Sequence, residues 1–150
     1  MSNIKLKKIF KTVCIASDHA GFDLKETIKN YLIDKKVSIF DAGPYDGNSV
    51  DYPDYAKKIA RRVASQRSEI GILVCGSGTG MAISANKTKG IRAAVCYNAK
   101  STRLSRQHNN ANIIALGSRL IKKDEAMKLI KVFLKTKFEG GRHLRRVKKI

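Results

Sequence analysis

The fold of this chain is decided by one stretch, Ile70-Gly71-Ile72-Leu73-Val74-Cys75-Gly76-Ser77-Gly78-Thr79-Gly80. Its first six residues form an apolar run without alternation, which predicts a strand buried on both faces, as in a parallel sheet. Three glycines at alternate positions follow, and a helical pattern starts at Met81. Such a loop turns backbone N–H groups around an anion. The stretch therefore predicts a buried strand that delivers a thiol, Cys75, to an anion-binding loop.

Four other short apolar runs predict strands of the same kind, and helical patterns lie between them. Apolar residues recur at helical spacing around 24–32, 56–63 and 126–134, and shorter helices are expected at about 80–87 and 99–107. This alternation predicts an α/β fold, an open and mainly five-stranded parallel sheet with helices on both faces, in a Rossmann-like three-layer arrangement. The other expected strands are Val13–Ala16, Val37–Phe40, Ile91–Cys96 and Ile113–Leu116.

The length of 150 residues predicts one domain, 1–150, with a basic extension at residues 1–10. No apolar run approaches the roughly 20 residues that span a bilayer, and no signal peptide follows the basic start. The three cysteines, Cys14, Cys75 and Cys96, are odd in number and have no CxxC spacing. We therefore expect reduced thiols in a cytoplasmic protein, without a disulfide framework or a zinc site.

The formal net charge of +19 raises the possibility of a nucleic-acid-binding domain. The charge is spread over solvated helix faces, however, and no reader motif occurs among the five Phe and five Tyr residues. A diffuse positive charge also attracts anionic small molecules. We therefore favour an anionic substrate and keep nucleic-acid binding as the less favoured alternative.

Ligands of open α/β sheets bind beyond the carboxyl ends of the strands, and polar residues gather there in this sequence. The first expected strand ends in Ser17-Asp18-His19, the third in the Cys75 loop and the fifth in Gly117-Ser118-Arg119. The loop fits neither the dinucleotide fingerprint nor the Walker pattern, so we expect no nucleotide cofactor. The histidines, including His108 and His143, show no metal-ligand spacing with a carboxylate or thiol, so we expect no metal.

A set of motifs in this order resembles the type B ribose-5-phosphate isomerases, a family shared with the galactose-6-phosphate isomerase subunits. The resemblance runs from about Lys11 to Ile150. Met81 stands where one branch of that family has a Glu base, so the chain resembles the cysteine branch. The motifs are Asp18-His19-Ala20-Gly21, Asp51-Tyr52-Pro53, Cys75 to Gly80, Asn86-Lys87 with Gly90-Ile91-Arg92-Ala93, Ser105-Arg106-Gln107-His108-Asn109, Gly117-Ser118-Arg119 and Phe138-Glu139-Gly140-Gly141-Arg142-His143.

The resemblance implies the interconversion of ribose 5-phosphate and ribulose 5-phosphate without a metal or organic cofactor. It makes Cys75 the base that moves a proton between C1 and C2, and Ser77 the hydroxyl that assists between O1 and O2. It makes His108 the ring-opening residue, with Asp18 nearby. A free thiol titrates near ~8.5, so this base needs an activating loop of N–H groups. The loop residues expected to bind substrate are Gly76, Ser77, Gly78, Thr79 and Gly80.

The same resemblance implies phosphate binding by His19 and three arginines, and sugar contacts from Tyr52, Asn109 and Asp18. It implies a homodimer or a dimer of dimers with shared active sites and a C-terminal helix at the interface. The segments around His108, Asn109 and Arg119 are then expected from the partner subunit. Two alternatives stay open, an isomerase of allose or galactose 6-phosphate and the nucleic-acid-binding domain. The three arginines are Arg119, Arg142 and Arg146.

Overall fold

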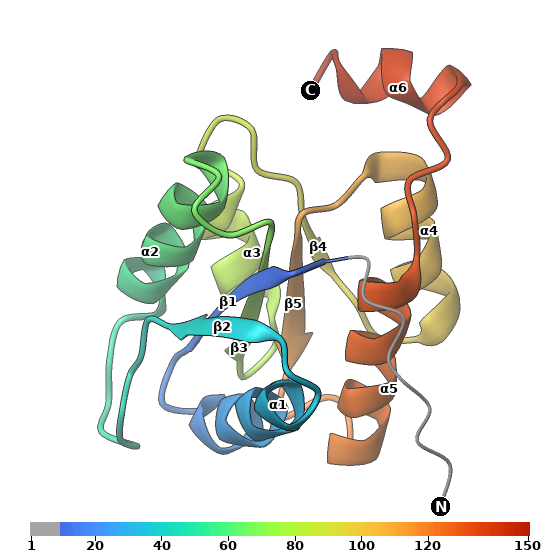
Figure 1. Cartoon of the computed structure of the whole chain (residues 1–150). Coiled ribbons are helices and arrows are strands. Elements are labelled where there is room, and N and C mark those ends of the chain that lie inside the picture. The colour runs from blue at the N-terminus through green and yellow to red at the C-terminus, as the bar shows by residue number, and fades with distance from the viewer. Residues whose placement is uncertain (1–9) are drawn as a thin grey trace, which may run out of the picture.

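The computed structural model describes residues 10–150 and contains one five-stranded sheet in the order β2-β1-β3-β5-β4 (Figure 1). Every pairing in it is parallel. The basic extension expected at residues 1–10 lies, apart from Phe10, outside the described residues. The strands are β1 (Thr12–Ser17), β2 (Ser38–Asp41), β3 (Ile70–Cys75), β4 (Ala93–Val95) and β5 (Ile113–Gly117).

Helices cover both faces of the sheet, which confirms the three-layer α/β prediction. One face packs against α1, α4 and α5, and the other packs against α2 and α3 (Figure 1). No helix among residues 10–150 is both long and apolar enough to cross a membrane. The helices are α1 (Phe22–Asp34), α2 (Tyr52–Ala64), α3 (Thr79–Ala85), α4 (Ala99–Asn109), α5 (Lys123–Lys135) and α6 (Arg142–Val147).

The position of the central strand β3 between two helical layers explains its unalternating apolar sequence. All six of its residues are buried. Ile72 and Val74 belong to the core under α1 and α5, whereas Leu73 and Cys75 belong to the core under α2 and α3. Successive side chains of a strand point to opposite faces, so a strand between two helical layers needs apolar residues at every position.

The fourth strand is shorter than the run Ile91–Cys96 predicted from the sequence. The Ile91 N–H donates to the Thr88 carbonyl at 3.1 Å, and the Arg92 N–H donates to Asn112 Oδ1 at 2.8 Å. These backbone groups are therefore used in a turn and a side-chain bridge, and regular pairing with β5 begins only at Ala93.

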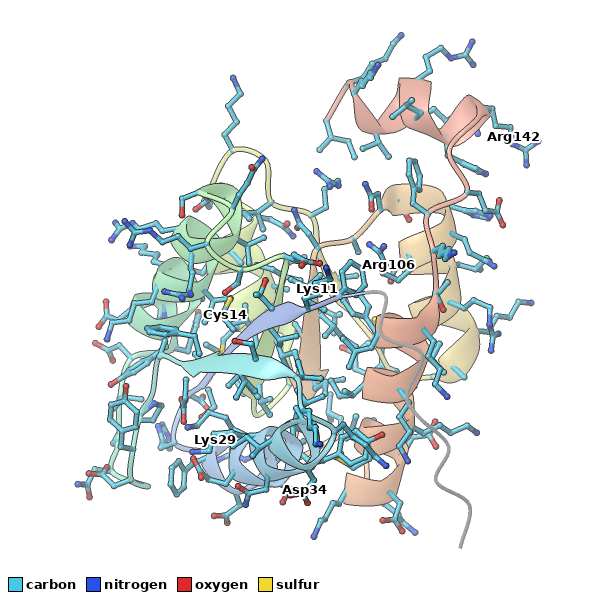
Figure 2. All side chains as sticks on the ribbon, in the orientation of Figure 1. Lys11, Cys14, Lys29, Asp34, Arg106 and Arg142 are labelled. Carbon is cyan, nitrogen blue, oxygen red and sulfur yellow. The ribbon has the colours of Figure 1, made fainter. Side chains whose placement is uncertain are left out.

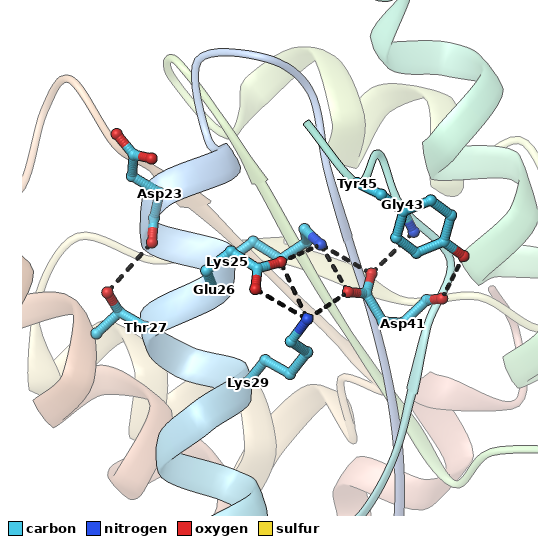
Figure 3. A network of polar contacts seen from close by, with 8 residues as sticks. All are labelled: Asp23, Lys25, Glu26, Thr27, Lys29, Asp41, Gly43 and Tyr45. Atoms are coloured by element: carbon cyan, nitrogen blue, oxygen red, sulfur yellow. Dashed lines mark hydrogen bonds and ion pairs between the residues drawn. The ribbon is translucent and has the colours of Figure 1, made fainter. Parts of the chain in front are cut away.

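A buried ionic cluster fixes the carboxyl end of β2 to α1 (Figure 3). Lys25 Nζ, which is 0% exposed, lies 2.7 Å from Asp41 Oδ2 and 2.9 Å from Glu26 Oε1, and Lys29 bridges the same two carboxylates. Burial alone would raise the pKa of Asp41, but hydrogen bonds from Lys25, the Gly43 N–H and Lys29 lower it overall. Asp41, the last residue of β2, thus has structural partners that sequence patterns did not reveal.

The two ends of the strands form two opposite sides of the sheet. We call the side at the carboxyl ends of the strands the carboxyl edge and the side at their amino ends the amino edge. The five strands are parallel, so their carboxyl ends share one edge, and each following helix runs back towards the other. The end of α4 lies just before β5 begins at Ile113, which places it at the amino edge. Helix α6 contacts α4 and lies beyond this edge (Figure 1).

Candidate active site

Cys75 is held at the carboxyl end of β3 by its own loop. Its side chain is buried, and the Gly78 N–H donates to Sγ at 3.1 Å. The Ser118 N–H donates to the Cys75 carbonyl at 2.8 Å, and the Ser118 hydroxyl lies 2.8 Å from the Ala20 carbonyl and 3.2 Å from the Cys75 carbonyl. The strand and loop therefore place a backbone N–H donor directly at the sulfur of this thiol.

The other two thiols are buried in the strands and lack such a loop. Burial raises the pKa of Cys14 to about 11, and burial also raises the pKa of Cys96. Both thiols stay protonated near neutral pH and pack as small apolar side chains. Cys75 is therefore the thiol that the fold equips for chemistry.

The glycine-rich loop is shaped by close contacts. Gly78 has φ +78°, and a Cβ at this position would lie 3.0 Å from the Leu116 carbonyl carbon. A Cβ at Gly80 would lie 2.7 Å from the ring of Tyr52, so Tyr52 packs directly against the loop. The Gly78 N–H goes to sulfur and the Thr79 N–H goes to Ser77 Oγ at 3.3 Å. Two N–H groups of the expected anion cradle are thus already used within the loop.

Arg119 lies beside the Cys75 loop of its own chain. Its N–H donates to the Gly76 carbonyl at 3.0 Å, and a Cβ at Gly76 would lie 3.3 Å from its Nη1. The expectation that Arg119 comes from the partner subunit is therefore wrong, because the turn after β5 lies directly beside the turn after β3. Arg119 and Ser118 also line a hollow of about 370 Å³ together with residues of α1.

Asp18 and His19 follow β1 at the same edge. The Asp18 N–H donates to the carbonyl of Val74, the residue before Cys75, and Asp18 Oδ1 accepts the Gly21 N–H at 2.9 Å. His19 is exposed, and its Nδ1 accepts the Val50 N–H at 3.3 Å. A neutral imidazole that accepts at Nδ1 carries its proton on Nε2, so His19 presents a donor to an anion.

The structure separates the expected site residues into two groups. The carboxyl-edge group lies around Cys75 and consists of Asp18, His19, Tyr52, residues 75–80 and Arg119. The amino-edge group lies at the end of α4 and on α6, where Figure 2 shows Arg142, and it consists of His108, Asn109, Arg142 and Arg146. One chain does not bring the two groups together, because they lie at opposite edges of its sheet.

His143 joins the amino-edge group, although no role was expected for it from the sequence. Its ring stacks on that of His108, with centroids 4.2 Å apart and planes at 12°. Glu139 Oε2 lies 3.7 Å from His143 Nε2. The expectation that no histidine has metal-ligand spacing with a carboxylate is therefore wrong, since Glu139 and His143 are four residues apart. The spacing signal was present, but only the fold places His108 beside it.

The ligand atoms of His108, Glu139 and His143 lie within 4.8 Å of one another, which is a candidate donor set for a metal ion. The two imidazoles are stacked, however, so their lone pairs lie in nearly parallel planes and do not meet at one point. An ion shared by both rings has to lie in both planes. This stacked arrangement is therefore not a metal chelate.

Comparison with known proteins decides the family. A profile described as Ribose/Galactose Isomerase matches residues 13–150. The chain belongs to this family. Ribose-5-phosphate isomerase B of Escherichia coli is 42% identical over 140 residues, covering 93% of this chain and 94% of the relative.

Solved structures of the same family superpose closely on this chain. The ribose 5-phosphate isomerase of Thermotoga maritima has 51% identity and a TM-score of 0.90, covering 92% of this chain and 95% of that one. Ribose-5-phosphate isomerase B of Mycoplasma genitalium, solved with bound ribulose-5-phosphate, has 44% identity and a TM-score of 0.88, with 92% of each chain covered. The family and fold suggested by the ordered motifs are confirmed.

Proposed function

We propose that this protein interconverts D-ribose 5-phosphate and D-ribulose 5-phosphate through an enediolate, with Cys75 as the base. The observation that carries the proposal is the Cys75 thiol at the carboxyl edge with the Gly78 N–H 3.1 Å from its sulfur. The Mycoplasma genitalium relative with bound ribulose-5-phosphate supports the choice of substrate. No cofactor and no metal is required for this proton transfer.

The proposed isomerisation moves one proton between neighbouring carbons. The Cys75 thiolate removes the proton from C2 of the open-chain aldose, and the electron pair passes through a C1–C2 double bond to O1. The Ser77 hydroxyl assists the proton shift from O2 to O1. The thiol then returns a proton to C1, and a carbonyl remains at C2. Donors in the loop stabilise the negative charge on oxygen that develops between these steps.

The remaining residues of the carboxyl-edge group bind and orient the substrate in this proposal. His19 directs its Nε2–H, and Arg119 its guanidinium, towards the phosphate dianion. Tyr52, packed on Gly80, contacts the sugar, and Asp18 lies beside the strand that carries Cys75. Phosphate binding far from the reacting carbons aligns them for proton transfer.

A complete site then requires a second copy of the chain. His108 opens the sugar ring, Asn109 contacts the sugar, and Arg142 and Arg146 bind phosphate, but all four lie at the opposite edge of their own sheet. We propose a homodimer or a dimer of dimers in which the amino-edge group of one chain completes the carboxyl-edge group of its partner. Helix α6, which carries two of these residues, would lie at this interface.

The enzyme would work in the cytoplasm, where thiols stay reduced. All three cysteines of the chain are free, and the proposed mechanism needs one of them as a thiolate. The substrate is a phosphorylated sugar, and the positive charge of the chain favours its approach.

The substrate is tested with the purified protein by comparing kcat/KM for ribose 5-phosphate, allose 6-phosphate and galactose 6-phosphate. The proposal predicts the highest kcat/KM for the five-carbon sugar. A higher kcat/KM for either six-carbon phosphate would change the assigned substrate but leave the assigned reaction, an isomerisation, unchanged. Absence of activity on all three, together with salt-resistant binding of an RNA oligonucleotide, would favour the nucleic-acid-binding alternative instead.

A further inference from the structure

A stacked pair of histidines lies in the amino-edge group, and only one member has a proposed role. His108 lies in the last turn of α4, and His143 lies in the first turn of α6. Their rings are 4.2 Å apart at 12°, and the His143 side chain is only 10% exposed. A side chain buried against a reactive group restricts the orientations that this group can adopt.

The backbone is built to bring these two rings together. The Glu139 N–H donates to the Gln107 carbonyl at 3.1 Å, which ties the segment before α6 to the end of α4. Gly140 and Gly141 then take φ +67° and +55°, a turn that residues with a Cβ rarely adopt. This turn starts α6 at the point where His143 covers His108.

The charges around His143 favour its neutral form. Burial, the neighbouring His108 and the cations Arg142 and Arg146 lower the pKa of His143, and Glu139 opposes this effect. These groups come from α4, from α6 and from the segment that joins α5 to α6, which are the elements packed around the ring. A neutral ring offers a stacking surface that does not repel a proton on its neighbour, whereas a second cation at 4.2 Å would.

We propose that His143 is a positioning residue that holds the His108 imidazole in the orientation required for opening the sugar ring. The inference rests on the proposed function. Ring opening breaks the C1–O4 bond and forms the C1=O1 double bond. The proton of O1–H moves to a base, and a proton is delivered to O4. His108 serves one of these two proton transfers, so the direction of its ring nitrogens decides the rate.

The chemistry of the two sugars provides a direct test. Ribose 5-phosphate is a closed furanose through O4, and its ring must open before C2 can react. Ribulose 5-phosphate has phosphate on O5, and O4 is too close to the C2 carbonyl to close a ring without severe strain. The ketose is therefore always open, and reaction from it begins without ring opening. A residue that only positions His108 affects the first reaction and not the second.

The experiment compares His143→Ala, His143→Phe and His108→Ala in two assays of the full-length protein. One assay measures conversion of ribose 5-phosphate. The other follows by proton NMR in D₂O the loss of the C1 protons of ribulose 5-phosphate, whether by isomerisation or by exchange. Arg145→Ala, a neighbouring cation on α6 that is exposed, is the matched control and should leave both rates unchanged.

His143→Ala should lower kcat for ribose 5-phosphate about tenfold, because the His108 ring loses its support. The same variant should lose the C1 protons of ribulose 5-phosphate within about twofold of the wild-type rate, since no ring is opened. His143→Phe retains an aromatic face and should recover most of the loss. His108→Ala should show the same selectivity for the closed sugar as His143→Ala.

Equal losses in the two assays for a folded His143→Ala protein would overturn the inference, and so would a His143→Phe protein as slow as His143→Ala. If the alanine variant does not fold, the phenylalanine variant still decides, because near-wild-type rates with both sugars support the stacking role and equal losses with both sugars refute the positioning of His108. Failure of the proposed function has a different signature. Wild-type protein would then leave both sugars unchanged, or Cys75→Ala would retain loss of the C1 protons.

Discussion

Replacing Gly78 with alanine tests how the loop controls the Cys75 thiol. Gly78 has φ +78°, and the left-handed region costs a residue with a Cβ about 1 kcal/mol. The added Cβ would also lie 3.0 Å from the carbonyl carbon of Leu116, a backbone atom that cannot turn aside. Together these effects should destabilise the native loop by about 2 kcal/mol or displace it.

Displacement moves the Gly78 N–H away from Cys75 Sγ. A hydrogen bond to a charged group contributes about 2 kcal/mol, and its loss from the thiolate corresponds to about thirtyfold in rate. We therefore expect kcat for ribose 5-phosphate to fall about thirtyfold, with a smaller change in KM. The assays are steady-state isomerase kinetics and thermal unfolding of the same preparations.

Gly90→Ala is the matched control. Gly90 has φ +86°, but a Cβ there would meet nothing within 4 Å, and the residue lies outside the proposed site. The Gly90→Ala variant should lose about 1 kcal/mol of stability and should keep wild-type activity. Wild-type kcat in Gly78→Ala, or an equal loss of kcat in Gly90→Ala, would refute the role given to the Gly78 N–H.

Three further predictions follow from the site and the core. Cys75→Ala should be nearly inactive and still bind inorganic phosphate in calorimetry. Near-wild-type activity in this variant would show that Cys75 is not the base. Arg142→Ala should mainly raise KM, and an unchanged KM would take that arginine from the phosphate site. Asp41→Asn should lower the free energy of unfolding by about 3 kcal/mol, more than Lys25→Met, because it leaves the buried ammonium without its nearest carboxylate. The Asp41 pKa is lowered, so this stabilisation is present above pH ~4 and is lost as the pH falls, and urea titrations at pH 7 and 3 should show a smaller pH effect in Asp41→Asn.

Local patterns in the sequence predicted the layers of the fold because periodicity reports which faces of each element are buried. The run Ile70–Cys75 agrees with β3 at both ends, since a central strand is apolar throughout. The run Ile91–Cys96 overestimated the length of β4, because an apolar pattern does not show that the Arg92 N–H bonds to the Asn112 side chain. The Lys25–Asp41 pair was missed for a similar reason, since a lysine at a helical position normally predicts a solvated face.

The sequence proposed a set of candidate site residues but not their arrangement. The ordered motifs gave candidate roles to Cys75, His19 and Arg142 by resemblance, and strand-end polarity pointed to the carboxyl edge. Placing Arg119 beside Gly76 required the three-dimensional contact between two turns. The stacking of His143 on His108 was not predicted, because the two rings come from different helices and sequence spacing carries no such information.

In the proposed dimer each active site combines the carboxyl edge of one chain with the amino edge of another. The most direct test mixes two defective proteins, Cys75→Ala and the double variant Arg142→Ala/Arg146→Ala, by co-expression, and measures activity at low ribose 5-phosphate, where each alone is nearly silent. In a mixed dimer one site is doubly defective and the other is complete. With random pairing, the preparation should show about a quarter of wild-type activity. Activity no higher than that of the parent variants, in a preparation that contains mixed dimers, would contradict the shared site.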